Sequence, residues 1–206
     1  MRYDITKLTL AADTLLPTLT DPRHIAIITN YRRHAIFEVT GHYARILAPD
    51  MCVDVPDYWL HSGGASVHIR GHADVTAIYA SLVRAEICVM MLENERLWVD
   101  EWGFSSMATF HTFMPGTWAI NKGAEVDDLD AIYIQTTEQS MQWPYDEHGR
   151  MIGERVWIGA PTFRKCPPEQ VITREEAEAR LMPLLDDWAY PVLGQSKAAA
   201  KITEPA

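Results

Sequence analysis

The spacing of apolar residues predicts two amphipathic helices in the N-terminal half of the chain. Asp21 and Pro22 suit the N-cap and first helical positions, so a helix is expected over residues 22–47, with Gly41 as its weak point. A second helix is expected over residues 72–84, where apolar residues form one stripe at helical spacing. Each helix has an apolar face that a further layer must cover.

Alternating and apolar runs predict strands along most of the remaining chain. Strands are expected over residues 51–55, 67–69, 86–92, 97–113, 131–143 and 151–158. Loops and turns are expected over residues 57–66, 93–96, 115–130 and 144–149. Thr173 and Glu176 form a capping box for a last helix over residues 174–190, which Pro183 interrupts.

This order of elements predicts an α+β fold. Helices come first and antiparallel strands follow, which differs from the alternation of an α/β chain. We expect a cone-shaped, curved antiparallel sheet wrapped around the N-terminal helices, with a pocket between the two layers. Residues 1–193 are expected to form a single domain, and the small, polar residues 194–206 a flexible C-terminal tail.

The amino-acid composition of the chain indicates which kinds of ligand it can bind. The 206 residues carry a formal charge of −10, which disfavours binding to nucleic acid or to an anionic membrane. Seven Trp, eight Tyr and nine Met indicate a large aromatic interior that can hold an apolar ligand. Three widely spaced cysteines suggest neither disulfides nor a zinc site. No export signal or membrane span is recognised, so a cytoplasmic protein is expected.

The sequence lacks the common motifs that bind nucleotide cofactors, and it shows no convincing nucleophile or metal-binding motif. There is no glycine-rich phosphate loop and no dinucleotide fingerprint. Ser62-Gly63-Gly64 lacks the flanking residues of a nucleophile elbow. His68 and His72 are four residues apart, but Gly71 lies between them where a strand turns into a helix. We therefore expect no cofactor and no metal.

A polar row on the first helix is the leading candidate for chemistry. His34 and Glu38 are spaced as neighbours one turn apart, and Tyr31 precedes them by three residues. A carboxylate beside an imidazole orients the ring and tunes it as a general base. Tyr31 can donate a proton or anchor a hydroxyl group. The alternative is a solvent-facing ion pair next to a packed tyrosine.

A second set of candidates surrounds Pro56. Asp54 is expected at a sheet edge, where an apolar pocket would raise the pKa of its carboxyl group; the alternative is a turn-capping residue. Tyr58, Trp59 and His61 follow in the expected loop, where the aromatic rings could stack on a substrate and His61 could donate a hydrogen bond. The alternative is a loop packed against a neighbouring subunit.

Two later strands supply the remaining candidates. Asp100 and Glu101 are adjacent in an expected strand, so only one can face the pocket, and Asp100 shares the more aromatic side with Trp102. Trp143 is a candidate for the pocket wall. The alternatives are a salt-bridged interface carboxylate for Asp100 and plain core packing for Trp143.

Three stretches carry a resemblance to a known family. They are residues 30–35, the Val53-Asp54-Val55-Pro56 segment with the helix start at residues 71–75, and the hairpin at residues 143–154. Over roughly residues 20–160, the chain resembles the nuclear transport factor 2-like superfamily in its SnoaL-like division. That superfamily includes ketosteroid isomerase, scytalone dehydratase and polyketide cyclases, together with bacterial lyases of lignin-derived diarylpropanes.

The resemblance implies a cone-shaped barrel, a homodimer or homotrimer, and cofactor-free acid/base chemistry in a mostly apolar pocket. The expected function is a lyase that eliminates water, with or without carbon–carbon cleavage to formaldehyde, from a bulky hydroxylated aromatic compound. The alternatives are an isomerase or a polyketide cyclase and, in another class, a non-catalytic ligand-binding or scaffold protein. Convergence of His34, Glu38, Asp54 and Asp100 on one pocket would favour the enzyme.

Overall fold

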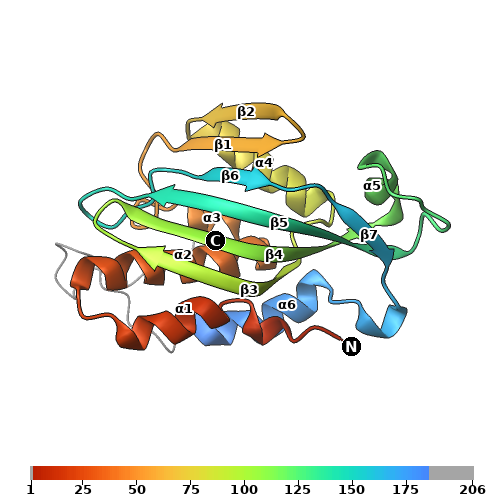
Figure 1. The fold of residues 1–206 in the computed structure, drawn as a ribbon, viewed down its shortest axis with the longest axis horizontal. Coiled ribbons are helices and arrows are strands. Elements are labelled where there is room, and N and C mark those ends of the chain that lie inside the picture. Colours follow the sequence, from red (N-terminus) through yellow and green to blue (C-terminus); the bar gives the residue numbers. More distant parts are fainter. Residues whose placement is uncertain (1, 186–206) are drawn as a thin grey trace, which may run out of the picture.

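The computed structural model describes residues 2–185, whose strands form a single curved sheet. Six strands follow the order β2-β1-β6-β5-β4-β3, and β7 pairs with β5 (Figure 1). Their bounds are β1 Asp57–Ser62, β2 Ala65–Arg70, β3 Met90–Val99, β4 Gly103–Pro115, β5 Ile132–Pro144, β6 Arg155–Ile158 and β7 Thr162–Lys165. Neighbouring strands are antiparallel except β1 and β6, which run parallel.

Helices cover one face of this sheet. Figure 1 shows α2, α3 and α4 behind the strands, with α1 and α6 along the side where β3 lies. The α-helices are α1 Leu10–Leu15, α2 Pro22–Thr40, α3 Tyr43–Ile46, α4 His72–Arg84, α5 Gly116–Asn121 and α6 Arg174–Leu181. Short 3-10 helices are η1 Ile5–Lys7, η2 Leu16–Thr18, η3 Pro168–Gln170 and η4 Met182–Leu185. This α+β arrangement of early helices and a curved, mainly antiparallel sheet confirms the predicted fold class.

The long helix α2 begins as predicted and ends earlier than predicted. The Asp21 carboxylate accepts hydrogen bonds from the backbone N–H groups of Arg23 and His24. Gly41 adopts a left-handed conformation with φ of 81°, which stops the helix at Thr40. The prediction of one helix to residue 47 is therefore wrong, and the short helix α3 follows instead.

The segment after α3 differs from the prediction in two places. Residues 57–66, predicted as a loop, enter the hairpin of β1 and β2, because Gly63 and Gly64 have positive φ and make a tight turn. Residues 51–55, predicted as a strand, contribute only one isolated bridge, between Cys52 and Met151. Both errors concern where backbone pairing occurs, which the local pattern alone does not determine.

The predicted turn at residues 93–96 is also wrong. β3 passes through this polar stretch with a register shift between Glu93 and Arg96, and Asn94 has a positive φ of 55°. The actual turn lies between Val99 and Gly103, so the predicted strand over residues 97–113 is divided in two. Charged residues resemble a turn in sequence, but here they form a bulge in an edge strand.

Other differences lie toward the ends of the chain. Helix α5 forms inside the predicted loop over residues 115–130, while α1 and β7 were not predicted. β6 begins at Arg155 rather than at residue 151. The last α-helix ends at Leu181 and continues as η4, which contains Pro183. Residues 186–190 of the predicted helix and the tail at 194–206 lie outside the described residues.

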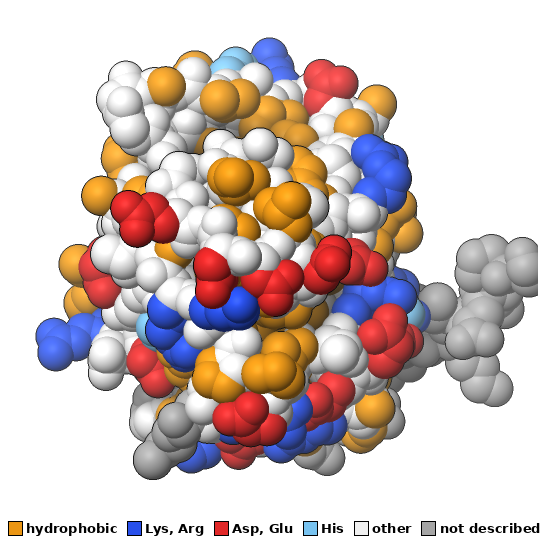
Figure 2. All heavy atoms as spheres, turned by 90° about the vertical axis from the view of Figure 1, so that its right-hand side faces the viewer, with side chains coloured by type: hydrophobic (Ala, Val, Ile, Leu, Met, Phe, Trp, Pro, Cys, Tyr) orange, Lys and Arg blue, Asp and Glu red, His pale blue; other side chains and the backbone are white. Residues whose placement is uncertain are grey.

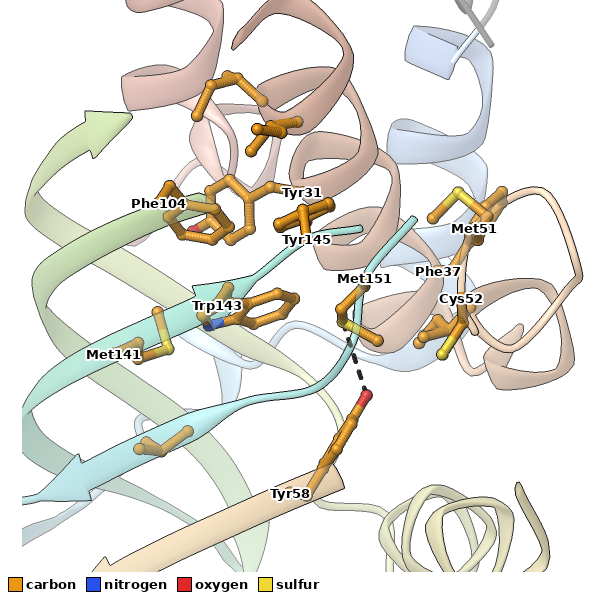
Figure 3. Packing of buried hydrophobic residues seen from close by; sticks show 14 of the residues in the cluster. Tyr31, Phe37, Met51, Cys52, Tyr58, Phe104, Met141, Trp143, Tyr145 and Met151 are labelled. Carbon is orange, nitrogen blue, oxygen red and sulfur yellow. Dashed lines mark hydrogen bonds between the residues drawn. The ribbon is translucent and has the colours of Figure 1, made fainter. Parts of the chain in front are cut away.

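The core lies between the helices and the inner face of the sheet. Tyr31 of α2 packs against Phe104 of β4 and Trp143 of β5, with ring centroids 4.6 and 5.5 Å apart respectively. Figure 3 shows these rings with Tyr145 and Met151 close by. No helix within residues 2–185 is both long and apolar enough to cross a lipid bilayer.

Candidate active site

A cavity of about 240 Å³ lies between the helices and the inner face of the sheet. Strands β1, β3, β4, β5 and β6 and helices α2 and α4 contribute to it. Most of its wall is apolar and includes Leu60, Ile78, Leu82, Met90, Leu92, Phe110, Met141, Val156 and Ile158. Such a wall suits a bulky apolar ligand, and the few polar groups in it then fix the orientation of that ligand.

Helix α2 contributes the polar row predicted from the sequence. Tyr31, His34 and Glu38 all line the cavity. Their spacing of three and four residues places them on one side of the helix, facing the sheet. His34 is fully buried. The solvent-facing alternative for this row is therefore wrong.

The hydroxyl group of Tyr79 connects three elements inside the cavity. Tyr79 of α4 donates a hydrogen bond to Oε1 of Glu154 at 2.9 Å. The same hydroxyl lies 3.0 Å from Nε2 of His34 and 3.2 Å from the hydroxyl of Tyr58. Tyr58 also donates to the sulfur of Met151, as Figure 3 shows. These contacts gather an imidazole, a carboxylate and two phenols in one buried network.

Two carboxylates approach the same imidazole nitrogen. Nε2 of His34 lies 3.5 Å from Oε2 of Glu38 and 3.5 Å from Oε1 of Glu154. Burial raises the pKa of Glu154 to about 7; His34 opposes this rise and Glu38 adds to it. Glu154 can therefore both hold and release a proton near neutral pH, which is what a general acid or base requires.

The two buried phenols remain protonated. Burial, reinforced by the charge of Glu154, raises the pKa of Tyr58 and the pKa of Tyr79 well above their ordinary value. A neutral phenol keeps its O–H group as a hydrogen-bond donor. Tyr58 and Tyr79 can thus stabilise an oxygen that becomes negatively charged during a reaction.

Two buried nitrogen atoms beside this network have no hydrogen-bond partner among the described residues. They are Nδ1 of His34 and Nε1 of Trp143. The two rings touch edge to face with centroids 4.6 Å apart, and Trp143 lines the cavity. In Figure 3 the indole nitrogen lies on the side of Met141, another cavity residue. Unpaired buried polar atoms cost stability and often mark functional sites.

A second ionisable pair stands near the same cavity. The hydroxyl of Tyr31 donates a short hydrogen bond to Glu95, which the bulge in β3 brings toward α2. Burial raises the pKa of Glu95 to about 7, and the bond from Tyr31 opposes this rise. Glu95 itself lines a separate groove between α1 and β3. Tyr31 therefore links the cavity to a second proton-binding group.

The structure places two predicted carboxylates away from the cavity. Asp54 is exposed, in the irregular segment before β1. Asp100 is exposed in the turn between β3 and β4, where its side chain accepts hydrogen bonds from the N–H groups of Trp102 and Gly103. Trp102 is 44% exposed in the same turn. The predictions that Asp54, Asp100 and Trp102 reach the pocket are wrong, because these segments are turns rather than inward-facing strand positions.

Trp59 and His61 point away from the cavity although Tyr58 lines it. Side chains alternate along a strand, so Tyr58 and Leu60 of β1 face inward while their neighbours face outward. Outside, Trp59 stacks on His68 with centroids 4.0 Å apart, and His61 lies 5.0 Å from Trp157. The predicted contact of Trp59 and His61 with a pocket is therefore wrong.

Three residues of the site were missed by the sequence analysis. Tyr79 belongs to the apolar stripe that predicted the second helix, and Glu154 ends the last stretch that carried the family resemblance. Glu95 lies in the segment predicted as a turn. Sequence spacing could not predict the contact of Tyr79 with Glu154, because it joins helix α4 to the segment before the distant strand β6.

Acidic and histidine side chains also gather near the surface. Among the described residues, Asp21, His24 and Glu101 form a group that places its potential ligand atoms within 4.8 Å of one another. Asp21 already caps α2, and Glu101 accepts contacts from both Arg23 and His24. Hydrogen bonds and ion pairs within the fold therefore account for this group.

Comparison with known proteins gives distant structural neighbours. Neither the protein-family models nor the curated proteins contain a match to the sequence. A protein from Jannaschia sp. CCS1 described as a SnoaL-like polyketide cyclase has 12% identity and a TM-score of 0.47, covering 68% of this chain and 90% of its own. The epoxide hydrolase/cyclase-like enzyme SalBIII has 15% identity and a TM-score of 0.41, covering 63% and 91% respectively.

A third neighbour is a nuclear transport factor 2-like protein of unknown function from Burkholderia pseudomallei. It has 14% identity and a TM-score of 0.39, covering 63% of this chain and 91% of its own. Two of these three neighbours are described as SnoaL-like or nuclear transport factor 2-like, the kind of protein that the sequence resembles. TM-scores and identities this low indicate a similar fold and give no information about reaction or substrate.

Proposed function

We propose that the cavity is the active site of a cofactor-independent lyase that eliminates water from a bulky, hydroxylated aromatic compound. One observation carries this proposal. Tyr79, His34 and Glu154 form a buried hydrogen-bonded network that lines an otherwise apolar cavity, and the pKa of Glu154 is about 7. A purely structural core would more commonly fill such a space with apolar side chains.

The cavity wall supports an aromatic substrate. Phe110 and Trp143 offer ring faces or edges, and aliphatic side chains complete the wall. A ring that displaces water from this wall gains hydrophobic free energy. The hydroxyl groups of the substrate would then meet Tyr58, Tyr79 and Glu154, which are polar groups of the cavity wall.

Dehydration needs only proton transfer. A base removes a proton from the carbon next to the hydroxyl-bearing carbon, and the C–H electron pair forms a C=C double bond. The C–O bond breaks, and the leaving oxygen takes a proton from an acid and departs as water. We assign Glu154 as the base, with His34 passing a proton to the leaving oxygen through Tyr79.

A diarylpropane-1,3-diol can react with the same groups. Here the base removes the proton of the terminal hydroxyl, and that O–H electron pair forms the C=O bond of formaldehyde. The electrons of the broken C–C bond form the double bond of a stilbene. The other hydroxyl leaves as water after taking a proton from the acid, so the reaction is redox-neutral.

Other reactions use the same acid and base. In an isomerase or cyclase, Glu154 would move a proton at a carbon next to a carbonyl group while the tyrosines hold the developing oxyanion. A non-catalytic ligand-binding or scaffold protein is the rival in another class. The convergence of His34, Glu38 and Glu154 on one cavity favours chemistry over a scaffold role.

A turnover screen tests the proposal. Purified protein is mixed with aromatic 1,3-diols and β-hydroxy aryl ketones, and absorbance is followed because the conjugated products absorb strongly. Glu154→Gln is expected to lower turnover by about 10²–10⁴-fold, as for other general acids and bases. The control is Glu147→Gln, because the side chain of Glu147 is 86% exposed in a turn. Equal turnover in Glu154→Gln and wild-type protein would refute the assignment.

A further inference from the structure

The cavity has two chemically different ends. At one end Tyr58, Tyr79, His34, Glu38 and Glu154 form the network described above. At the other end Lys122, Gln135 and Thr112 line the wall. Lys122 follows α5, whereas Thr112 and Gln135 lie opposite each other on β4 and β5. The two ends are therefore separated along the length of the sheet.

The geometry of β5 gives this separation. Trp143, which touches His34, and Gln135 both line the cavity from β5. They are eight residues apart in one strand, which corresponds to roughly 27 Å at the usual rise per residue. Residues from both positions line the cavity of about 240 Å³, so the cavity extends along this stretch of β5. This extent suits an elongated ligand rather than a compact one.

Lys122 brings a positively charged ammonium group to the residues that line this cavity. Among the described residues that line it, Lys122 is the single lysine and there is no arginine. Within residues 2–185, no hydrogen bond or ion pair of its ammonium group is found, although its backbone N–H bonds to Trp118 and Ala119. Gln135, which also lines the cavity, adds an amide that can donate a hydrogen bond. An ammonium group with no such partner at the end of an apolar channel attracts an anion.

Lys122 is also exposed, whereas the network at Glu154 is buried. A ligand that reaches Glu154 can therefore keep its charged end near solvent, where an anion loses little hydration. Figure 2 shows the face of the molecule at the α5 end, where charged side chains of both signs lie around groups of hydrophobic ones.

We propose that the natural substrate is an elongated apolar molecule with a single anionic group, such as a carboxylate, which Lys122 binds while the opposite end reaches Tyr79 and Glu154. The reacting end rests on the proposed function, but the anion site does not depend on which reaction occurs. Lys122 is thus a specificity-determining residue that selects carboxylates over neutral analogues of the same shape.

Ligand binding tests this inference without turnover. The probes are 6-(2-naphthyl)hexanoate and its primary amide, titrated by naphthalene fluorescence. Wild-type protein is expected to bind the carboxylate about fivefold more tightly than the amide. This factor of about five corresponds to the binding free energy that one partly exposed ion pair contributes. Lys122→Gln is expected to lose this preference, and Lys122→Arg to retain it.

Two controls separate the anion site from other effects. Lys7 lines the separate groove between α1 and β3, so Lys7→Gln is expected to keep the full preference. Glu154→Gln is also expected to keep it, because the proposed base lies at the opposite end. Equal affinity for the two probes in wild-type protein, a preference that persists in Lys122→Gln, or binding of neither probe would overturn the inference. None of these results would change the outcome of the turnover screen.

Discussion

Tyr79 donates a hydrogen bond to Glu154 across the cavity, joining helix α4 to the segment that leads into β6 at 2.9 Å. Both residues are buried, so the contact lies in a medium of lower dielectric constant than water. The phenol stays neutral while the carboxyl group titrates near neutral pH. This pair therefore combines a fixed hydrogen-bond donor with a group that exchanges protons.

Stability is expected to fall as pH rises through neutrality. Burial raises the pKa of Glu154 from its ordinary value of 4.5 to about 7, so the folded state holds a proton that the unfolded state has lost in this window. The contribution is complete below about pH 4.5 and is lost above about pH 7, on the order of 1–3 kcal/mol. Urea unfolding of wild-type protein at about pH 5 and about pH 8 measures it.

Glu154→Gln is the matched variant, because glutamine keeps the shape of the neutral acid. Its free energy of unfolding should change less over the same window than that of wild-type protein. Glu95 has a pKa raised in the same direction, so a smaller fall should remain in Glu154→Gln. An identical pH dependence in both proteins would show that Glu154 is not held protonated by the fold.

His34→Ala and Asp54→Asn are expected to behave differently. His34 is fully buried in the cavity network, so its loss should lower turnover by about 10²–10⁴-fold. Asp54 is exposed outside the cavity, so Asp54→Asn should leave turnover close to that of wild-type protein. Steady-state rates on a substrate found in the absorbance screen decide the matter. Equal losses in both variants would mean that the cavity is misassigned.

Gly153→Ala is expected to disturb the position of Glu154. A Cβ atom at this position would lie 1.9 Å from the backbone oxygen of Asp57, so β1 and the segment before β6 would have to separate. Such overpacking typically costs about 1–3 kcal/mol. A lowered melting temperature together with reduced turnover is the expected result. An unchanged melting temperature would contradict the close approach of the two backbones.

Homodimers or homotrimers are expected in solution. Trp98, Met107 and Trp157 are 52%, 56% and 41% exposed and lie on the outer face of the sheet. Exposed apolar groups of this kind often mark association surfaces. Light scattering at micromolar concentration should give the mass of two or three chains. A single-chain mass would remove this expectation.

The sequence predicted the fold class because the signals for it are local. Asp21 and Pro22 mark the start of α2, and residues 131–143 nearly coincide with β5. The failures occur where pairing between distant segments decides the structure. The segment of β1 was predicted as a loop because Gly63 and Gly64, which make the tight turn of its hairpin, are typical loop residues. The polar bulge of β3 was predicted as a turn.

The residues of the candidate site also differ in how far the sequence could predict them. Tyr31, His34 and Glu38 could be identified because helical spacing places them on one face. Tyr58 and Trp143 also line the cavity as expected. Glu154 and Tyr79 could not be identified, because their contact spans 75 positions in the sequence. The predicted positions of Asp54 and Asp100 in the cavity are wrong, because both depended on strands that do not form at these residues.

Carbon-13 NMR of the Glu154 side-chain carboxyl measures the pKa on which the proposed proton transfer depends. The signal is assigned as the resonance that disappears in Glu154→Gln, and its shift is followed with pH in the intact protein. We expect a midpoint at about pH 7, because burial beside Glu38 disfavours the charged form of Glu154. A midpoint near the ordinary value of 4.5 would contradict the assignment of Glu154 as a proton-transfer group of the cavity.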